Sequence, residues 1–145
     1  MFKRLLFTNL LLLTGCSITQ EPTSSKPLLD YDDFKDRQVL FSDTFLIDEP
    51  DYMLYIYSLT CGHCKEIKQD VLNYVNDVDY PIYLSQFTSD IVVGNDIEET
   101  IGVSSTDDLF IAGTPTLIHI IDKKVYANIP GTSSILSYLS LQLEN

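Results

Sequence analysis

The chain has 145 residues, of which 45% are hydrophobic and 21% are charged. This is the length of one domain, and the composition is that of a globular protein rather than of a disordered or low-complexity chain. Nine lysines and arginines against 21 aspartates and glutamates give a net charge of −12. Such acidity argues against nucleic-acid binding, which needs clustered basic side chains. Three cysteines are too few for a disulfide-rich scaffold.

Residues 1–15 have the pattern of a secretory signal peptide. Lys3 and Arg4 precede a nearly unbroken apolar run from Leu5 to Leu13. The run is shorter than the roughly 20 residues that span a bilayer, but it matches the roughly 7–15 apolar residues of a signal sequence. An uncleaved N-terminal anchor is the alternative interpretation.

The end of this run, Leu13-Thr14-Gly15-Cys16, resembles the bacterial lipobox. The resemblance implies that Cys16 is lipidated and becomes the new N-terminus, so that it anchors the protein and takes no part in redox chemistry. Cleavage would remove two basic residues and no acid, leaving a charge of −14. Residues 16–27 would then form the lipidated cysteine and a polar flexible tether, and residues 28–145 the folded domain. The predicted location is the extracytoplasmic side of a bacterial membrane.

The first half of the domain contains one strong strand and one strong helix. Residues 28–37 predict a short helix, residues 38–47 a strand or an irregular extended segment, and residues 48–51 a turn. Residues 52–58 form a short, continuous run of aromatic and aliphatic side chains, which predicts a strand buried on both faces. Residues 61–79 follow as an amphipathic helix, whose apolar face comprises Ile67, Val71, Tyr74, Val75 and Val78.

The second half alternates short strands and helices. The pattern predicts a strand at 81–87, a short helix at 96–101, a hairpin of strands 116–121 and 124–129, and a closing helix at 132–143. A strand–helix–strand start requires a parallel pair with a crossover helix, and the hairpin adds antiparallel strands. The predicted fold class is therefore α/β, with a central mixed β-sheet and helices on its faces.

The candidate site is Cys61-Gly62-His63-Cys64, where the strand at 52–58 turns into the next helix. The spacing lets the two sulfurs face each other and close a small disulfide. The free N–H groups and the positive dipole end of the helix stabilise a thiolate on Cys61, which is the candidate nucleophile. Cys64, predicted to be more buried, is the resolving thiol. His63 favours the thiolate and makes the disulfide more oxidising, and Gly62 leaves the approach open.

Zinc binding is an alternative use of these cysteines. Zinc needs four ligands, and the sequence contains no second pair of cysteines. His63 and His119 would have to come together to complete the set. We therefore predict no metal and no cofactor beyond the dithiol itself. A pair of buried cysteines without chemistry is the remaining alternative.

Two stretches resemble thioredoxin-fold disulfide oxidoreductases. Tyr55–Lys65 (YIYSLTCGHCK) is similar to the active-site strand and helix start of that family, and its CGHC resembles the motif of protein disulfide isomerase domains. Gly113-Thr114-Pro115-Thr116 resembles the cis-proline turn of the family. The resemblance covers residues 39–143 and implies a thioredoxin-like three-layer fold. It also implies that Pro115 packs against the disulfide and that the backbone of Thr114 pairs with a substrate chain.

Two positions depart from the family pattern. Thr60 stands where the family usually has tryptophan, and Tyr55 stands where it often has a buried carboxylate that helps to deprotonate the second cysteine. A tyrosine cannot act as that carboxylate near neutral pH. Proton transfer at Cys64 is therefore predicted to be slower or to rely on water.

The leading hypothesis is an exported, lipid-anchored thiol–disulfide oxidoreductase that acts on exported proteins through Cys61 and Cys64. The direction is open, because His63 favours an oxidase or isomerase and the membrane tether suits a reductase with a membrane redox partner. One alternative is a copper chaperone that uses Cys61, Cys64 and a histidine, since soft thiolates suit Cu(I). The other is a peptide-binding adaptor on the same fold, in which the cysteine pair is a structural staple.

Overall fold

The computed structural model describes residues 26–142. The predicted signal peptide, Cys16 and most of the tether lie outside the described residues, as do residues 143–145. Within the described range, no helix has the length and apolar character needed to cross a membrane.

A four-stranded mixed sheet forms the centre of the fold. Its strands are β1 (Asp51–Tyr57), β2 (Ile82–Gln86), β5 (Thr116–Ile121) and β6 (Lys124–Pro130), in the order β2-β1-β5-β6. β1 pairs with β2 in parallel, whereas the β1–β5 and β5–β6 pairs are antiparallel. The helix α1 (Gly62–Asp77) connects β1 to β2, and α2 (Thr132–Gln142) follows β6. This order and these connections confirm the predicted thioredoxin-like α/β fold.

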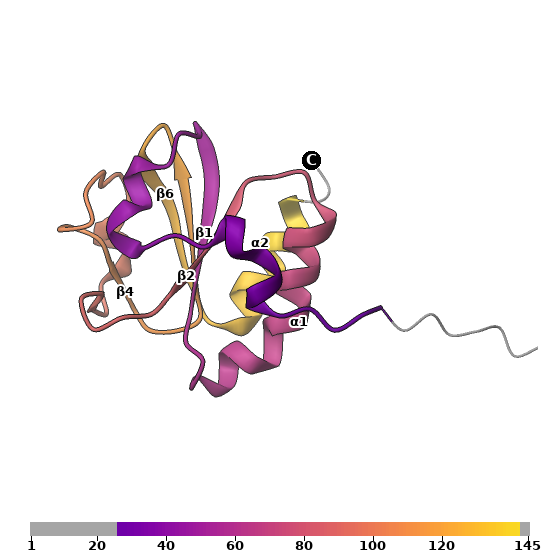
Figure 1. The fold of residues 1–145 in the computed structure, drawn as a ribbon. Helices are drawn as coiled ribbons and strands as arrows, with labels where there is room; N and C mark the ends of the chain where they lie inside the picture. Colours follow the sequence, from indigo (N-terminus) through magenta and orange to yellow (C-terminus); the bar gives the residue numbers. More distant parts are fainter. Residues whose placement is uncertain (1–25, 143–145) are drawn as a thin grey trace, which may run out of the picture.

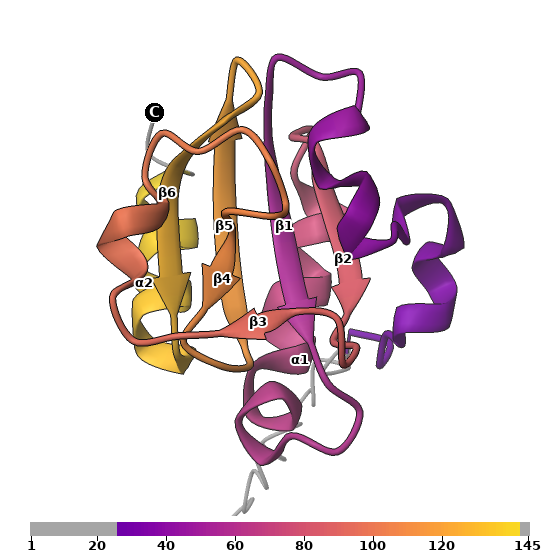
Figure 2. The ribbon, with the colours of Figure 1, turned by 90° about the vertical axis from the view of Figure 1, so that its left-hand side faces the viewer.

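The two faces of the sheet are covered differently. Figure 1 shows α1, α2 and the 3-10 helix η1 (Tyr31–Arg37) on one side of the sheet. The other side carries only short elements: the 3-10 helices η2 (Phe41–Leu46) and η3 (Ile97–Thr100) and a small parallel sheet of β3 (Val92–Val93) and β4 (Phe110–Ile111). Figure 2 looks onto this irregular face, where β3 and β4 lie in front of the central sheet.

β1 is buried because its side chains alternate between two hydrophobic cores. On the helical face, the strand packs Met53, Tyr55 and Tyr57. On the irregular face, it packs Tyr52, Leu54 and Ile56. A strand covered on both sides has no polar face, so it appears in the sequence as a continuous apolar run. The prediction for this strand is confirmed.

The amphipathic helix, the hairpin and the closing helix are also confirmed. α1 buries the apolar positions Ile67, Val71 and Val75 against the sheet. The hairpin turns at Asp122 and Lys123, which have φ angles of 50° and 61°. Positive φ at both central residues is the requirement of the tight type I′ turn, whose twist matches that of the flanking strands.

Residues 38–47, predicted as a strand or an irregular extended segment, form neither over most of their length. Only Gln38 forms a bridge, to Leu84, before the chain turns into η2. The buried Thr44 explains this turn: its hydroxyl donates to the Phe41 carbonyl at 2.5 Å, and its own carbonyl accepts from the Tyr52 hydroxyl at 2.5 Å. The short helix expected at 96–101 forms as the 3-10 helix η3, and the β3–β4 sheet was not predicted.

Candidate functional site

Cys61 caps the N-terminus of α1, directly after the turn that follows β1. Its backbone is extended, and its Sγ accepts a hydrogen bond from the backbone N–H of Cys64 at 3.2 Å. The Cys61 N–H donates to the Ser58 carbonyl at 3.2 Å, which fixes the turn. No acidic residue lies in the first turn of α1, so nothing there offsets the positive end of the helix dipole that favours a thiolate.

The two thiols differ in accessibility and in acidity. Cys61 is partly exposed, whereas only 1% of Cys64 is exposed. Burial raises the pKa of the Cys64 thiol to about 11, and the adjacent Cys61 sulfur adds to this effect. Partial burial also opposes ionisation of Cys61, but hydrogen bonds from the Cys64 thiol and from the backbone N–H groups of Cys64 and His63 outweigh it and lower the pKa of Cys61.

The turn before β5 completes the site from the other side. The Thr114–Pro115 peptide bond is cis, as the family resemblance predicts. The Sγ of Cys61 donates to the Thr114 carbonyl at 3.2 Å, and Pro115 is buried. Residues more than 50 positions apart in the chain therefore meet at Cys61.

Gly62 and His63 border the site without covering it. A Cβ atom added at Gly62 would meet no atom within 4 Å, so the space above it is open. The Nδ1 atom of His63 lies 3.3 Å from the Glu66 carboxylate, and both side chains are mostly exposed. Thr60 is also exposed, and its hydroxyl lies 3.1 Å from that of Ser58.

A small cavity adjoins the buried thiol. Its volume is about 90 Å³, and it is lined by Tyr31, Ser58, Leu59, Cys64, Lys65 and Lys68. Tyr31 comes from η1, and its ring stacks on Tyr57 with 3.7 Å between the ring centroids. Nothing in the sequence places Tyr31 at the site, because only the packing of η1 against the sheet brings it there.

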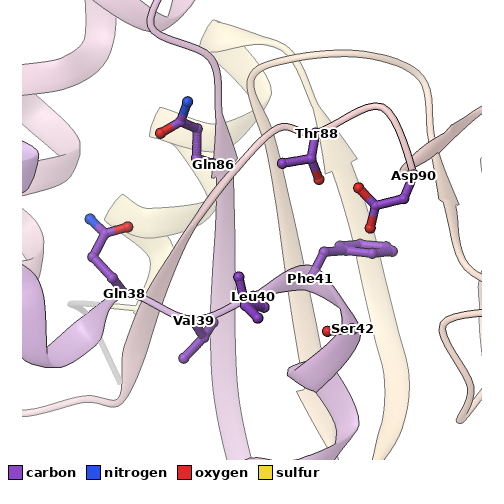
Figure 3. A pocket seen from close by; sticks show the side chains of 8 residues that line it. All are labelled: Gln38, Val39, Leu40, Phe41, Ser42, Gln86, Thr88 and Asp90. Carbon is purple, nitrogen blue, oxygen red and sulfur yellow. The ribbon is translucent and has the colours of Figure 1, made fainter.

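A larger hollow lies beside the end of β2. Its volume is about 490 Å³, and Figure 3 shows Gln38, Phe41, Gln86 and Asp90 among the side chains around it. Neither cysteine nor histidine lines it. The hollow therefore offers no thiol for disulfide exchange.

Metal coordination has little support in the described residues. Between residues 26 and 142, no group of three or more histidine, cysteine, aspartate or glutamate side chains could hold a metal ion. The ring of His119 is engaged elsewhere, with Nε2 2.7 Å from the Asp51 carboxylate and Nδ1 2.5 Å from the Tyr138 hydroxyl. His119 therefore does not complete a ligand set with Cys61 and Cys64.

The arrangement is suited to thiol–disulfide exchange. An accessible thiol of lowered pKa can attack a disulfide as a thiolate, and the buried thiol one turn along the helix can then attack Cys61 Sγ. This division of roles between Cys61 and Cys64 follows from their burial and acidity.

No protein-family model and no curated protein matches the chain. Among solved structures, it is similar to thioredoxin from Aeropyrum pernix, with 21% identity, a TM-score of 0.48, and coverage of 72% of this chain and 79% of that one. Spinach chloroplast thioredoxin f in its short form gives 18% identity, a TM-score of 0.49, and coverage of 72% and 89%. Mitochondrial thioredoxin 3 from Saccharomyces cerevisiae has 15% identity and a TM-score of 0.46, and the match covers 74% of this chain and 92% of that one. The fold of the chain follows from its own strand order and connections.

Proposed function

We propose that this chain is an extracytoplasmic, membrane-anchored thiol–disulfide oxidoreductase that exchanges disulfides with exported proteins. The observation that carries the proposal is the asymmetry of the dithiol. Cys61 is accessible, caps a helix and has a lowered pKa, whereas Cys64 is buried and has a raised pKa. Two structural cysteines would need neither this difference nor an open approach to one of them.

In the reducing direction, the Cys61 thiolate attacks a disulfide of the substrate and forms a mixed disulfide. One substrate sulfur leaves with the electron pair and takes up a proton. Cys64 then loses its proton, attacks Cys61 Sγ and releases the second substrate thiol, which leaves Cys61 and Cys64 joined. The oxidising direction reverses these steps. We propose that the Thr114 backbone, whose carbonyl accepts from Cys61 Sγ, also pairs with an extended substrate segment.

The anchoring part of the proposal is supported by the sequence alone. The apolar segment ending in Leu13-Thr14-Gly15-Cys16 indicates export and lipidation of Cys16, and the polar segment after it suits a tether. We propose exported proteins with thiols or disulfides as substrates and a membrane redox protein as the electron partner.

The first test is the redox equilibrium of the dithiol. The full chain carrying Cys16→Ser is equilibrated with a glutathione redox series in mild detergent, and the Cys61–Cys64 couple is read by thiol alkylation and mass. We expect a reversible two-electron couple. A potential above about −200 mV would indicate an oxidase or isomerase, and one below about −240 mV a reductase.

The second test is capture of the partner. In Cys64→Ser, the mixed disulfide on Cys61 has no resolving thiol, so we expect exported proteins to remain linked to the variant in cells. The matched control, Cys61→Ser/Cys64→Ser, should capture none. A pair that never forms a disulfide would contradict the proposal. Copper bound tightly in a Cys61-dependent manner would then favour the chaperone, and a biological effect retained by the double variant would favour the adaptor.

A further inference from the structure

Two buried tyrosine hydroxyls lie beside the resolving thiol without a hydrogen-bond partner among the other described groups. Tyr31 and Tyr55 are 6% and 0% exposed, and both belong to the same core as Cys64. The two hydroxyls lie close to each other and interact as a pair, both are near enough to the Cys64 sulfur to feel its charge, and neither makes a hydrogen bond to any other described group. Buried polar groups in proteins are nearly always paired, so two orphans at one place call for a physical explanation.

The small cavity lies between Cys64 and the surface. Tyr31 and Cys64 line its inner part, and the exposed residues Leu59 and Lys65 line its mouth. Its volume of about 90 Å³ is several times that needed for one water, whose share of liquid volume is about 30 Å³. The cavity is therefore large enough for water to approach Cys64, while the Tyr31 hydroxyl itself lies buried behind the cavity wall.

Two basic side chains, Lys65 and Lys68, line the cavity beside Cys64. The Lys68 ammonium lies 4.9 Å from the centroid of the Tyr31 ring. Lys68 is also held by the Asp30 carboxylate at 2.6 Å. The remaining titratable groups that face Cys64 are Cys61, on the same helix, and Tyr55 and Tyr57, on β1.

We propose that water in this cavity takes up the Cys64 proton and that the hydroxyls of Tyr31 and Tyr55 stabilise the Cys64 thiolate during resolution. The inference rests on the proposed function, since it concerns the second step of disulfide exchange. In that step, the proton of the Cys64 S–H bond passes to cavity water and then to solvent. The thiolate forms a bond to Cys61 Sγ, and the sulfur of the partner leaves with the electron pair and takes up a proton from solvent.

The tyrosines act as donors and not as bases. Burial raises the pKa of both Tyr31 and Tyr55 above the ordinary value for tyrosine, so both keep their protons over the range in which the protein works. A neutral hydroxyl can donate a hydrogen bond to a thiolate, and such a charge-assisted bond is stronger than one between neutral groups. The two hydroxyls would thus gain a charged partner only when Cys64 ionises.

The test separates the two steps of exchange in time. The reduced full chain carrying Cys16→Ser is mixed with an excess of an aromatic disulfide that releases a coloured thiolate. The first release reports attack by Cys61 and depends on the reagent concentration. The second reports resolution by Cys64 and does not depend on it. Cys64→Ser should show the first release alone.

The variants are Tyr31→Phe, Tyr55→Phe and the double variant, which remove only hydroxyl groups. We expect the second phase to slow by about tenfold in the double variant at neutral pH, with its pH midpoint moved upward by about one unit, while the first phase stays unchanged. The matched control is Tyr52→Phe, because Tyr52 is equally buried on β1 but faces the other core. Tyr52→Phe should leave both phases unchanged.

The outcomes distinguish the inference from the proposed function. A second phase of unchanged rate and pH midpoint in the double variant would overturn the inference while the function stands. Two other outcomes would also overturn the inference, because they would indicate a general loosening of the core. One is an equal slowing of the second phase in Tyr52→Phe. The other is a lower unfolding midpoint in Tyr55→Phe that parallels the slowing of its second phase. A first phase no faster than that of a free thiol would instead count against the proposed function.

Discussion

Two groups of tyrosines lie on the helical face of the sheet, at opposite ends of β1. At the end of β1, Tyr31 and Tyr55 lie beside Cys64 with unpaired hydroxyls. Near its start, Tyr80 and Tyr138 flank His119, and here every polar group is engaged. We refer to the first set, with Cys61 and Cys64, as the thiol cluster.

The second set, with Asp51 and His119, is the histidine cluster. The His119 ring lies within hydrogen-bond distance of three groups: the Asp51 carboxylate at 2.7 Å, the Tyr138 hydroxyl at 2.5 Å and the Tyr80 hydroxyl at 3.0 Å. Tyr80 also donates to Asp51. These hydrogen bonds connect α2 with β5, with β1 and with the segment before β2, so the cluster stabilises the packing of these elements.

The difference shows how the same side chain serves stability in one place and reactivity in another. A buried hydroxyl with a partner recovers the hydrogen bonds that it lost with water, whereas one without a partner keeps the cost of desolvation. The histidine cluster is therefore expected to stabilise the fold. The thiol cluster is expected to contribute little stability and to act when charge appears on Cys64.

The largest expected effect is loss of stability in alkali, which affects both clusters. In an unfolded chain, cysteine ionises at about pH 8.5 and tyrosine at about pH 10. Burial raises the pKa of Cys64 to about 11 and that of Tyr138 to about 12 in the folded chain. The neutral forms stabilise the fold fully below about pH 8.5, and this contribution is lost as the pH rises toward the folded-state values.

Urea unfolding of the reduced chain at a series of pH values measures this loss. We expect the urea midpoint to be level at neutral pH and to fall steadily above about pH 8.5. A urea midpoint that stays constant up to about pH 11 would show that the burial of these groups does not favour their neutral forms.

The next effect separates the clusters. His119→Ala should lower the free energy of unfolding by about 3 kcal/mol, because it leaves a cavity and removes the shared partner of Asp51 and Tyr138. Both phases of the reaction with the aromatic disulfide should remain at wild-type rates. A slowed second phase in this variant would mean that the two clusters are coupled through β1 and β5.

The smallest effect is a comparison of two single hydroxyls. Tyr138→Phe removes a paired hydroxyl and should cost about 1 kcal/mol of stability. Tyr55→Phe removes a hydroxyl whose one polar neighbour is the Tyr31 hydroxyl, and it should cost less. Chemical unfolding of the two variants under identical conditions measures the difference. Equal losses would contradict the view that the Tyr55 hydroxyl is less well paired than the Tyr138 hydroxyl in the resting protein.

The elements that the sequence predicts correctly are those with strong internal periodicity. β1 and α1 each bury a long, regular set of side chains, and the hairpin has its two-residue turn between two apolar runs. The segments on the irregular face are too short for periodicity to reveal. β3 and β4 have two residues each, and η2 depends on the hydrogen bonds of one buried threonine, Thr44.

The site was predictable only where its residues form local motifs. The pair Cys61 and Cys64 and the turn at Thr114 are visible in the sequence, and the fold brings them to within hydrogen-bond distance. Tyr55 is visible in the sequence as a departure from the pattern of thioredoxin-fold oxidoreductases. Tyr31 carries no local signal, because its place beside Cys64 depends on the way η1 packs on Tyr57.

The path of the chain into the domain has a consequence for orientation. Lys26 pairs with Asp77 at the C-terminal end of α1, whereas Cys61 caps the N-terminal end of the same helix. The 16 residues of α1 span about 24 Å. The point where the described chain enters the domain and the reactive sulfur therefore lie at opposite ends of α1. For the lipid anchor that we propose at Cys16, this geometry puts the dithiol at the end of the domain remote from the tether, where it is open to a substrate chain.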